Sequence, residues 1–327
     1  MKTAVVLMNL GTPVAPTKKA VKAFLREFLS DPRVVEVPRP VWMFVLHMIV
    51  IPLRAARVAK AYRSIWGERG SPLRSITEQQ VGLLDKKLQS QLGKRAPMVR
   101  YAMTYSGPEL ERVIEELEQQ GVEHFLILPL YPQYSATTTG SVYDRVTAII
   151  SHRRNIPEIQ LIKQYFDHPL YIDALAQTVR EKWEKTKRPQ RLLMSFHSIP
   201  EKYCDQGDPY FQQCDTTAKR LAEALQLEDG QWAMSFQSRV GFSKWLSPYT
   251  IEVLEQWGSE KLESVDVICP AFSADCLETL EEIDEENRQA FLQAGGGHFE
   301  FIPCLNDHPA HIDLMVSLVN QYLPNND

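Results

Sequence analysis

Short apolar runs alternate along the whole chain with longer amphipathic segments. The runs that predict strands are Thr3–Leu10, Met98–Thr104, His124–Leu130, Ile159–Gln164, Arg191–Phe196, Ala233–Gln237 and Val265–Cys269. The helical periodicity between them predicts helices at Ser75–Leu92, Pro108–Gln119, Tyr171–Glu184, Pro209–Leu227 and Asp275–Gln293. Such alternation is typical of α/β proteins, in which parallel sheets carry helices on both faces.

The length of 327 residues favours two packed domains over a single core. The basic, proline-containing segment Lys185–Gln190 is a candidate crossover between two strand–helix units. We therefore predict an N-terminal domain of residues 1–185 and a C-terminal domain of residues 186–327, with the last helix packing back on the first domain. No sequence repeat is visible, although the two halves are compatible with a repeat in structure.

Composition narrows the function classes. A net charge of −5 gives no electrostatic argument for binding nucleic acid, and no GxGxxG or Walker A motif follows a predicted strand. The five cysteines form no CxxC pair, and the first ten residues read as a strand rather than a signal peptide. A cytosolic protein with reduced thiols is expected. Cys204 and Cys214 are an alternative metal or iron–sulfur pair.

Four predicted strands end in unusual polar segments. These segments begin at Asn9 (NLGTP), Tyr131 (YPQYS, continuing to Gly140), His197 (HSIP) and Asp275, the start of an acidic helix. Open parallel sheets bind ligands beyond the carboxyl ends of their strands. The pattern predicts a cleft lined by hydroxyl groups, aromatic rings, a histidine and carboxylates.

The acidic helix is the strongest chemical signal. Glu278, Glu282 and Glu285 are spaced i, i+4 and i+7, which would place three carboxylates on one helical face. Like charges at this spacing repel, and a bound cation would offset the repulsion. The alternative is helix capping, since Asp275 and Glu278 fit an acidic capping box.

His197 stands at the end of a hydrophobic strand, where its side chain can face the same cleft. Neutral imidazole accepts protons near neutral pH and binds borderline metals. His298, His308 and His311 compete for this role, and Asp307-His308-x-x-His311 has the spacing of a surface metal pair. An N-terminal cap made by Asp307 is the simpler explanation of that second motif.

Pro40–Leu53 (PVWMFVLHMIVIPL) is almost wholly apolar and is bordered by Arg39, Arg54 and Arg57. It is shorter than the roughly 20 residues of a membrane-spanning helix. A buried core helix, an interfacial segment and a lid over a large apolar ligand are all compatible with it. The arginines would suit lipid head groups or ligand carboxylates.

Taken together, these segments resemble the ferrochelatase family, whose members insert ferrous iron into a porphyrin to make haem. The matching motifs are NLGTP (Asn9–Pro13), GSPL (Gly70–Leu73), LPLYPQYSATTTGS (Leu128–Ser141), SFHSIP (Ser195–Pro200), GDPY (Gly207–Tyr210), FQSRVGFSKWLSPYT (Phe236–Thr250) and CPAFSADCLETLEEID (Cys269–Asp284). They cover nearly the whole chain in the family's order, and they look most like the enzymes of Gram-negative bacteria.

The resemblance implies a fold of two Rossmann-like, chelatase-type domains with a porphyrin cleft between them. It places an active-site lip at about residues 38–57, which favours the lid and interfacial readings of the apolar run. It carries the catalytic and metal-binding pair onto His197 and Glu278, and an acidic path onto Asp275, Glu282 and Glu285. It also implies that the macrocycle is contacted by Met8, Arg54, Tyr62, Ser71, Tyr131 and Trp245.

Two departures from the family pattern leave that central pair intact. Cys276 stands where animal enzymes have a second histidine, and Thr104 replaces an arginine before Tyr105.

The implied activity is that of a lyase of haem biosynthesis, which inserts Fe²⁺ into protoporphyrin IX and releases two protons. A planar porphyrin resists metal entry, so the protein must bend the ring and remove protons. His197 would accept protons or deliver metal, and Glu278 would hold iron or relay protons. There are two alternatives: a chelatase for another tetrapyrrole, such as coproporphyrin, and a non-catalytic porphyrin or haem carrier. A carrier would not need the acidic residues Glu278, Glu282 and Glu285.

The expected partners are protoporphyrin IX, Fe²⁺ as substrate, a membrane surface touched by the 40–53 segment, and the preceding enzyme of the haem pathway; nucleic acid is not expected. No tightly bound cofactor is expected. The resemblance also implies no iron–sulfur cluster, because the sequence after Cys304 lacks the cysteine-bearing tail that holds such a cluster in some family members. The expected location is cytoplasmic, peripheral on the inner face of the cytoplasmic membrane.

Overall fold

The protein divides into two compact units, each with its own parallel sheet. The computed structural model describes residues 2–239 and 243–323, so part of the Phe236–Thr250 motif and the last four residues lie outside the described residues. One unit comprises Met1–Tyr131, Ser135–Gln164 and Ile312–Asp327, and the other comprises Pro132–Tyr134 and Tyr165–His311.

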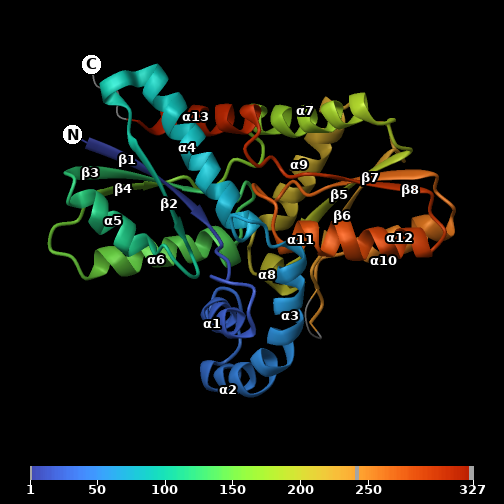
Figure 1. Cartoon of the computed structure of the whole chain (residues 1–327), viewed down its shortest axis with the longest axis horizontal. Coiled ribbons are helices and arrows are strands. Elements are labelled where there is room, and N and C mark those ends of the chain that lie inside the picture. Colours follow the sequence, from blue (N-terminus) through green and yellow to red (C-terminus); the bar gives the residue numbers. More distant parts are fainter. Residues whose placement is uncertain (1, 240–242, 324–327) are drawn as a thin grey trace. The chain divides into compact units, whose positions relative to one another are not determined.

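The first unit is built on four parallel strands in the order β2-β1-β3-β4. The strands are β1 (Lys2–Asn9), β2 (Met98–Met103), β3 (Val122–Pro129) and β4 (Glu158–Leu161). The helical elements are α1 (Lys18–Leu29), α2 (Arg39–Val45), the π-helix η1 (Leu46–Val50), α3 (Ile51–Ile65), α4 (Pro72–Leu92), the 3₁₀ turn η2 (Gly93–Arg95), α5 (Leu110–Glu118), the π-helix η3 (Ala136–Gly140) and α6 (Ser141–Ser151). Figure 1 shows α4 on one face of this sheet and α5 and α6 on the other. The alternate β1 residues Ala4, Val6 and Met8 pack against α5 and α6, as the period of a strand requires.

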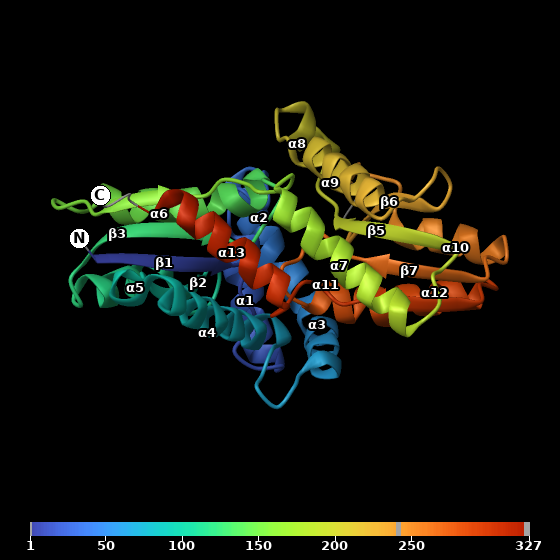
Figure 2. The same cartoon turned by 90° about the horizontal axis from the view of Figure 1, so that it is seen from above.

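The second unit repeats this design with strands in the order β6-β5-β7-β8. The strands are β5 (Arg191–His197), β6 (Trp232–Gln237), β7 (Ser264–Ile268) and β8 (His298–Ile302). The helical elements are α7 (Pro169–Lys185), α8 (Glu201–Asp205), α9 (Tyr210–Ala224), α10 (Thr250–Ser259), α11 (Leu277–Leu280), the π-helix η4 (Glu282–Asn287), α12 (Arg288–Gln293) and α13 (Pro309–Tyr322), whose residues from Ile312 onward belong to the first unit. In Figures 1 and 2, α7 and α9 lie on one face of this sheet and α10 and α12 on the other.

Both sheets have the same topology, because the first strand of each unit lies between its second and third. The strand order therefore reverses beside this first strand. The switch point lies between β1 and β3 in one unit and between β5 and β7 in the other. Loops diverge at such a switch point and leave a crevice beyond the strand ends, where α/β proteins bind ligands. The fold thus marks the ends of β5 and β7, and those of β1 and β3, as candidate sites.

The sequence-based fold prediction is confirmed: the structure is α/β with two parallel sheets flanked by helices. All seven predicted strands are present, and β8 was missed. Its polar residues His298 and Glu300 alternate with buried Phe299 and Phe301, which is typical of an edge strand with one solvated face. The contacts place α7 with the second sheet, whereas the predicted boundary lies after it at residue 185.

Gly11, the glycine of the NLGTP motif, is required by the backbone at the end of β1. Its φ is +107°, and a Cβ atom built there would lie 1.7 Å from the carbonyl oxygen of Tyr105. The Tyr105 N–H donates to the Leu10 carbonyl at 2.9 Å, so the two chain segments touch at the end of β1. Only glycine fits both the backbone angle and this close approach.

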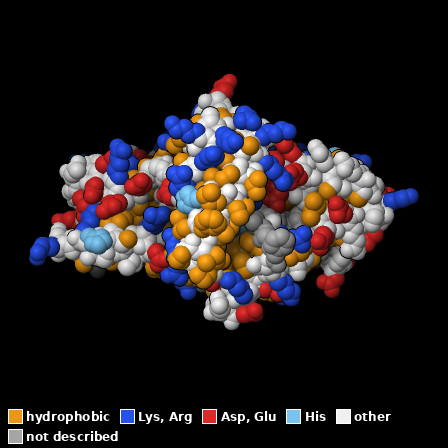
Figure 3. All heavy atoms as spheres, turned by 90° about the horizontal axis from the view of Figure 1, so that it is seen from below, with side chains coloured by type: hydrophobic (Ala, Val, Ile, Leu, Met, Phe, Trp, Pro, Cys, Tyr) orange, Lys and Arg blue, Asp and Glu red, His pale blue; other side chains and the backbone are white. Residues whose placement is uncertain are grey.

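The segment α2–η1–α3 exposes a hydrophobic face on the first unit. Its outward side chains are Val41, Phe44, Met48, Ile49 and Leu53, which are between 47% and 74% exposed. Figure 3 shows hydrophobic side chains gathered on this side of the molecule, with Lys and Arg side chains around them. Over Arg39–Ile65 the helical stretch has 27 residues, long and apolar enough to cross a membrane by length and composition alone, and 17% of its apolar window is buried. The buried-core interpretation of this run is therefore wrong for its outward face.

The π-helical turn in this segment has a local cause. Pro52 lacks an N–H group, and its ring would clash with the carbonyl four residues earlier in a regular helix. The chain instead widens by one residue, and the Ile51 N–H donates to the Leu46 carbonyl.

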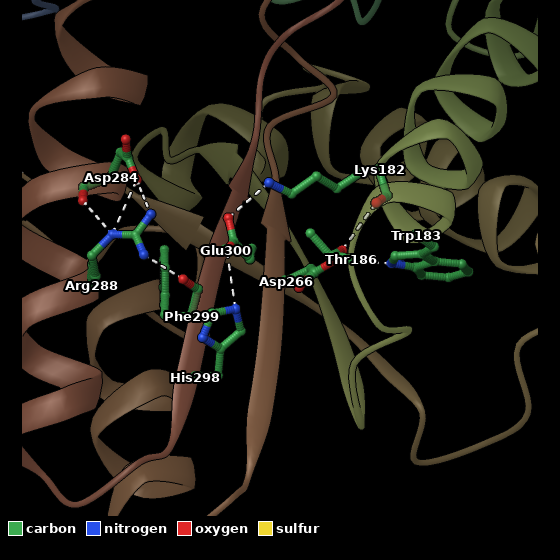
Figure 4. Close-up of polar contacts among 9 residues, drawn as sticks. All are labelled: Lys182, Trp183, Thr186, Asp266, Asp284, Arg288, His298, Phe299 and Glu300. Carbon is green, nitrogen blue, oxygen red and sulfur yellow. Dashed lines mark hydrogen bonds and ion pairs between the residues drawn. The ribbon is translucent and has the colours of Figure 1, made fainter.

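A polar cluster crosses β7, β8 and α7 on the second unit (Figure 4). Asp266, 1% exposed in β7, accepts a hydrogen bond from Trp183 Nε1 at 2.9 Å. Its register neighbour Glu300 forms an ion pair with Lys182 at 2.7 Å. Burial raises the pKa of Asp266 from 3.8 to about 6, although the Trp183 hydrogen bond opposes the rise.

We expect Asp266→Asn to raise the free energy of unfolding near neutral pH by about 1–3 kcal/mol. The folded state holds the Asp266 proton more tightly than the unfolded chain, so this group lowers stability as pH rises from about 4 to 6. Asparagine removes the buried charge and still accepts from Trp183. Urea unfolding at about pH 5 and pH 7 measures the effect, which should shrink at the lower pH. The exposed Asp229→Asn is the control, and no gain in stability at pH 7, or an equal effect at both pH values, would contradict the prediction.

Candidate functional site

His197 ends strand β5 and is half-buried at the β5/β7 switch point. Its Nδ1 lies 2.6 Å from the carbonyl oxygen of Ser198, which can only accept, so Nδ1 carries the proton. In the neutral ring, Nε2 is then the unprotonated nitrogen that can take a proton or bind a metal. The Phe272 ring lies beside the imidazole, with centroids 6.4 Å apart.

Glu278 lies in α11, which follows β7. Its carboxylate is not used for capping: the capping box is formed by Cys276 and Thr279, and the Cys276 N–H donates to Thr279 Oγ1 at 3.0 Å. Burial and the neighbouring Glu278 carboxylate raise the pKa of the Cys276 thiol, so the sulfur stays protonated and is a poor metal ligand. The half-buried Glu278 carboxylate therefore neighbours the protonated Cys276 thiol and does not cap the helix.

Glu282 approaches the same site from the first turn of η4. Its Oε1 accepts from the Ser238 N–H at 2.7 Å, and its Oε2 accepts from the Ser238 hydroxyl. Burial raises the pKa of Glu282 and the nearby Glu278 charge adds to the rise, whereas Ser238 and His197 oppose it. His197, Glu278 and Glu282 therefore form one electrostatically linked group.

Asp275 and Glu285 take different positions from these two glutamates. The Asp275 carboxylate is buried and accepts from Thr279 Oγ1, the Cys304 N–H and Asn306 Nδ2, so it anchors the start of α11. Glu285 is exposed. The predicted single helix is interrupted by η4, in which the Glu286 N–H donates to the Glu281 carbonyl five residues back. Because of this wider turn, Glu285 does not follow Glu278 and Glu282 along one face, as it would in a regular α-helix.

The structure adds two residues that the sequence reasoning did not single out, Gln237 and Ser238. Gln237 ends β6 and bonds to Glu278 and Glu282, and Ser238, the next residue, bonds to Glu282. Ser238 has a φ of +67°, a left-handed conformation uncommon outside glycine. Their place in the FQSRVGFSKWLSPYT motif was a signal, but their contacts depend on tertiary structure.

The predicted macrocycle contacts are distributed over both units. Met8 and Tyr131 lie at the ends of β1 and β3, where Tyr131 packs against the hydrophobic cluster that contains Met8. Ser71 precedes α4 and accepts a hydrogen bond from Thr12 Oγ1 at 2.9 Å, which brings it to the end of β1. Tyr62 is buried in α3, and Arg54 is exposed on the same helix. Trp245 lies in the second unit, half-buried.

The competing histidines have structural partners. The His308 Nδ1 accepts from the Ala310 N–H, so His308 rather than Asp307 caps α13. The His311 Nδ1–H donates to the Asn306 carbonyl at 2.8 Å, and burial lowers the pKa of His311 to about 4.

A resident metal site would need several converging ligands. Within residues 2–239 and 243–323, no group of three or more His, Cys, Asp or Glu side chains is arranged to hold a metal ion. Cys204 and Cys214, in α8 and α9, are free thiols. The His197 cluster supplies one imidazole and two carboxylates, which are side chains able to accept and release protons.

The fold is that of the chelatases. Among solved structures it resembles the sirohydrochlorin chelatase SirB from Bacillus subtilis subspecies spizizenii, with 13% identity, a TM-score of 0.56 and coverage of 98% of this chain and 95% of that chain. It also resembles CbiX, described as the terminal enzyme for the biosynthesis of sirohaem in denitrifying bacteria, with 13% identity, a TM-score of 0.52 and coverage of 99% and 100%. At these identities the likeness shows the fold alone.

Sequence comparison defines the family. Residues 2–323 match the ferrochelatase family. The chain is 51% identical to the ferrochelatase of Aeromonas hydrophila subsp. hydrophila (97% of this chain, 98% of the relative) and 49% identical to that of Psychrobacter cryohalolentis (97% and 93%). The protein therefore belongs to the ferrochelatase family, and the resemblance found in the sequence is confirmed.

Proposed function

We propose that the insertion of iron into protoporphyrin, the reaction of the ferrochelatase family and the terminal step of haem biosynthesis, takes place at His197, Glu278 and Glu282. The observation that carries this proposal is the linkage of one imidazole with two carboxylates at a strand-end switch point. Fe²⁺ is a substrate of the reaction.

The proton balance supports this assignment. Two pyrrole N–H protons leave the macrocycle for each Fe²⁺ that enters, so the protein must accept two protons. His197 Nε2 is the first acceptor, because Nδ1 is held by the Ser198 carbonyl. The raised pKa of Glu282 brings this carboxylate towards the range in which it can accept and release a proton at working pH. Glu278, which neighbours Glu282, binds the incoming iron, and the exposed Glu285 leads to solvent.

We further propose that the porphyrin is contacted by Met8, Arg54, Tyr62, Ser71, Tyr131 and Trp245. Apolar and aromatic groups suit the faces of the macrocycle, and Arg54 with the Ser71 hydroxyl suits its carboxylates.

The test is anaerobic mixing of the protein with ferrous iron and protoporphyrin IX, with the Soret band followed over time. Rapid conversion to the metalloporphyrin spectrum is expected. Tight porphyrin binding without metal insertion would indicate a carrier. Faster insertion into coproporphyrin than into protoporphyrin would assign the other substrate.

We also propose that the exposed face of α2–η1–α3 binds peripherally to a membrane surface. The apolar side chains of this face lie beside Arg39, Arg54 and Arg57, an arrangement that suits insertion at the head-group boundary of an anionic bilayer.

Replacing Phe44 and Leu53 together with glutamate is expected to lower binding to anionic vesicles at least about tenfold, because burial of each side chain is worth roughly 1.5–3 kcal/mol. Vesicle co-sedimentation with phosphatidylglycerol and with neutral lipid measures this, and the exposed Ile156→Glu is the control. If the wild-type protein binds neither kind of vesicle, the membrane proposal is wrong, and the preceding enzyme of haem synthesis is the partner to test on this face.

A further inference from the structure

We propose that Gln237 is a positioning residue for iron insertion, which fixes the glutamates of the α11–η4 segment relative to His197. The inference rests on the proposed function of the His197, Glu278 and Glu282 cluster. It assigns no contact between Gln237 and either substrate, so Gln237 would act only through its neighbours.

The side-chain amide of Gln237 bonds to the segment that carries the carboxylates. Its Nε2 donates to the backbone carbonyl of Glu278 at 2.6 Å and lies 3.5 Å from Glu282 Oε2. The amide therefore sets where the first turn of α11 sits and helps to orient the Glu282 carboxylate. A short bond to backbone restrains Glu278 without occupying its carboxylate.

The backbone of Gln237 bonds to the strand that carries the imidazole. Gln237 is the register partner of His197 in the β5/β6 pair. Its carbonyl accepts from the Ser198 N–H at 2.8 Å, and the Ser198 carbonyl in turn accepts from His197 Nδ1. One residue thus connects to both halves of the site.

The orientation of the amide is determined by buried donors beneath it. Gln237 Oε1 accepts from Ser195 Oγ at 2.8 Å and from Cys269 Sγ at 3.5 Å. Ser195 is held by Thr250 Oγ1 at 2.7 Å, and Thr250 also bonds to Ser235. Because Oε1 faces donors and Nε2 faces acceptors, the amide has one satisfactory orientation. Gln237 is 3% exposed, so water cannot readily replace these bonds.

Gln237→Glu is the variant that tests the proposal. It keeps the size of the side chain and an acceptor for Ser195, but it removes the donor to Glu278 and Glu282. We expect kcat for iron insertion to fall about 10- to 100-fold, since small displacements of catalytic groups have effects of this size. The KM for protoporphyrin should change less than about twofold.

A double-mutant cycle separates positioning from general damage. If Gln237 aligns the glutamates with His197, Gln237→Glu should cost much less in a His197→Ala background than in the wild type. Gln237→Leu serves as a second, uncharged variant, and buried Gln213→Leu on α9 controls for the loss of a buried glutamine. Thermal unfolding is measured for all variants.

An unchanged kcat in Gln237→Glu or Gln237→Leu would overturn the inference, and so would losses that simply multiply with His197→Ala. Neither outcome would affect the proposed function, which is tested separately by iron insertion in the wild type and by the turnover of His197→Ala and Glu278→Gln.

Discussion

His197→Ala is expected to lower kcat for iron insertion by about 10²–10⁴-fold, the range for loss of a general base. The imidazole is held at the end of β5 with Nδ1 donating to the Ser198 carbonyl, so its free nitrogen is Nε2. Alanine leaves no group at this position to accept the first pyrrole proton. Porphyrin binding, followed by fluorescence, should be retained, because the predicted macrocycle contacts are other residues.

His152→Ala, an exposed histidine of the first unit, is the matched control and should keep wild-type turnover. Retention of near wild-type turnover in His197→Ala would assign proton removal to a different group. A loss of porphyrin binding in step with kcat would instead make His197 a binding residue.

Glu278→Gln is the second large effect, with an expected loss in kcat/KM of about 10²–10³-fold for ferrous iron. The substitution preserves size but removes the negative charge that we propose attracts Fe²⁺ and that raises the pKa values of Cys276 and Glu282. If Glu278 holds iron, the KM for Fe²⁺ should rise. If it only relays protons, kcat should fall at an unchanged KM for Fe²⁺.

Glu255→Gln on α10 is the matched control, since it removes an exposed carboxylate from the same unit. Initial rates at varied ferrous iron and saturating porphyrin make the comparison. Turnover by Glu278→Gln equal to that of Glu255→Gln would contradict the role proposed for Glu278.

The alternation of apolar and amphipathic segments was enough to predict the fold class, seven of the eight strands that the structure describes, and the helices α4, α5, α7 and α9. Buried parallel strands are nearly continuous apolar runs, so they are visible without structure. Strand β8 was missed because the polar residues His298 and Glu300 interrupt its short apolar run, as is usual in an edge strand. The sequence also did not show that α7 belongs with the second sheet. The apolar pattern of a helix indicates that one face is buried, but not which sheet it packs against.

The sequence by itself determined that His197 ends a strand and that Glu278 and Glu282 follow another, because strand ends and residue spacing are local properties. Only the tertiary structure decided that Cys304 and Asn306 hold the Asp275 carboxylate, that η4 widens the helix beneath Glu285, and that Gln237 reaches both sides of the site. These features depend on contacts between residues about 30 to 50 positions apart or on the exact turn of a helix. Hydrophobic periodicity reports burial, but it does not say which donor meets which acceptor.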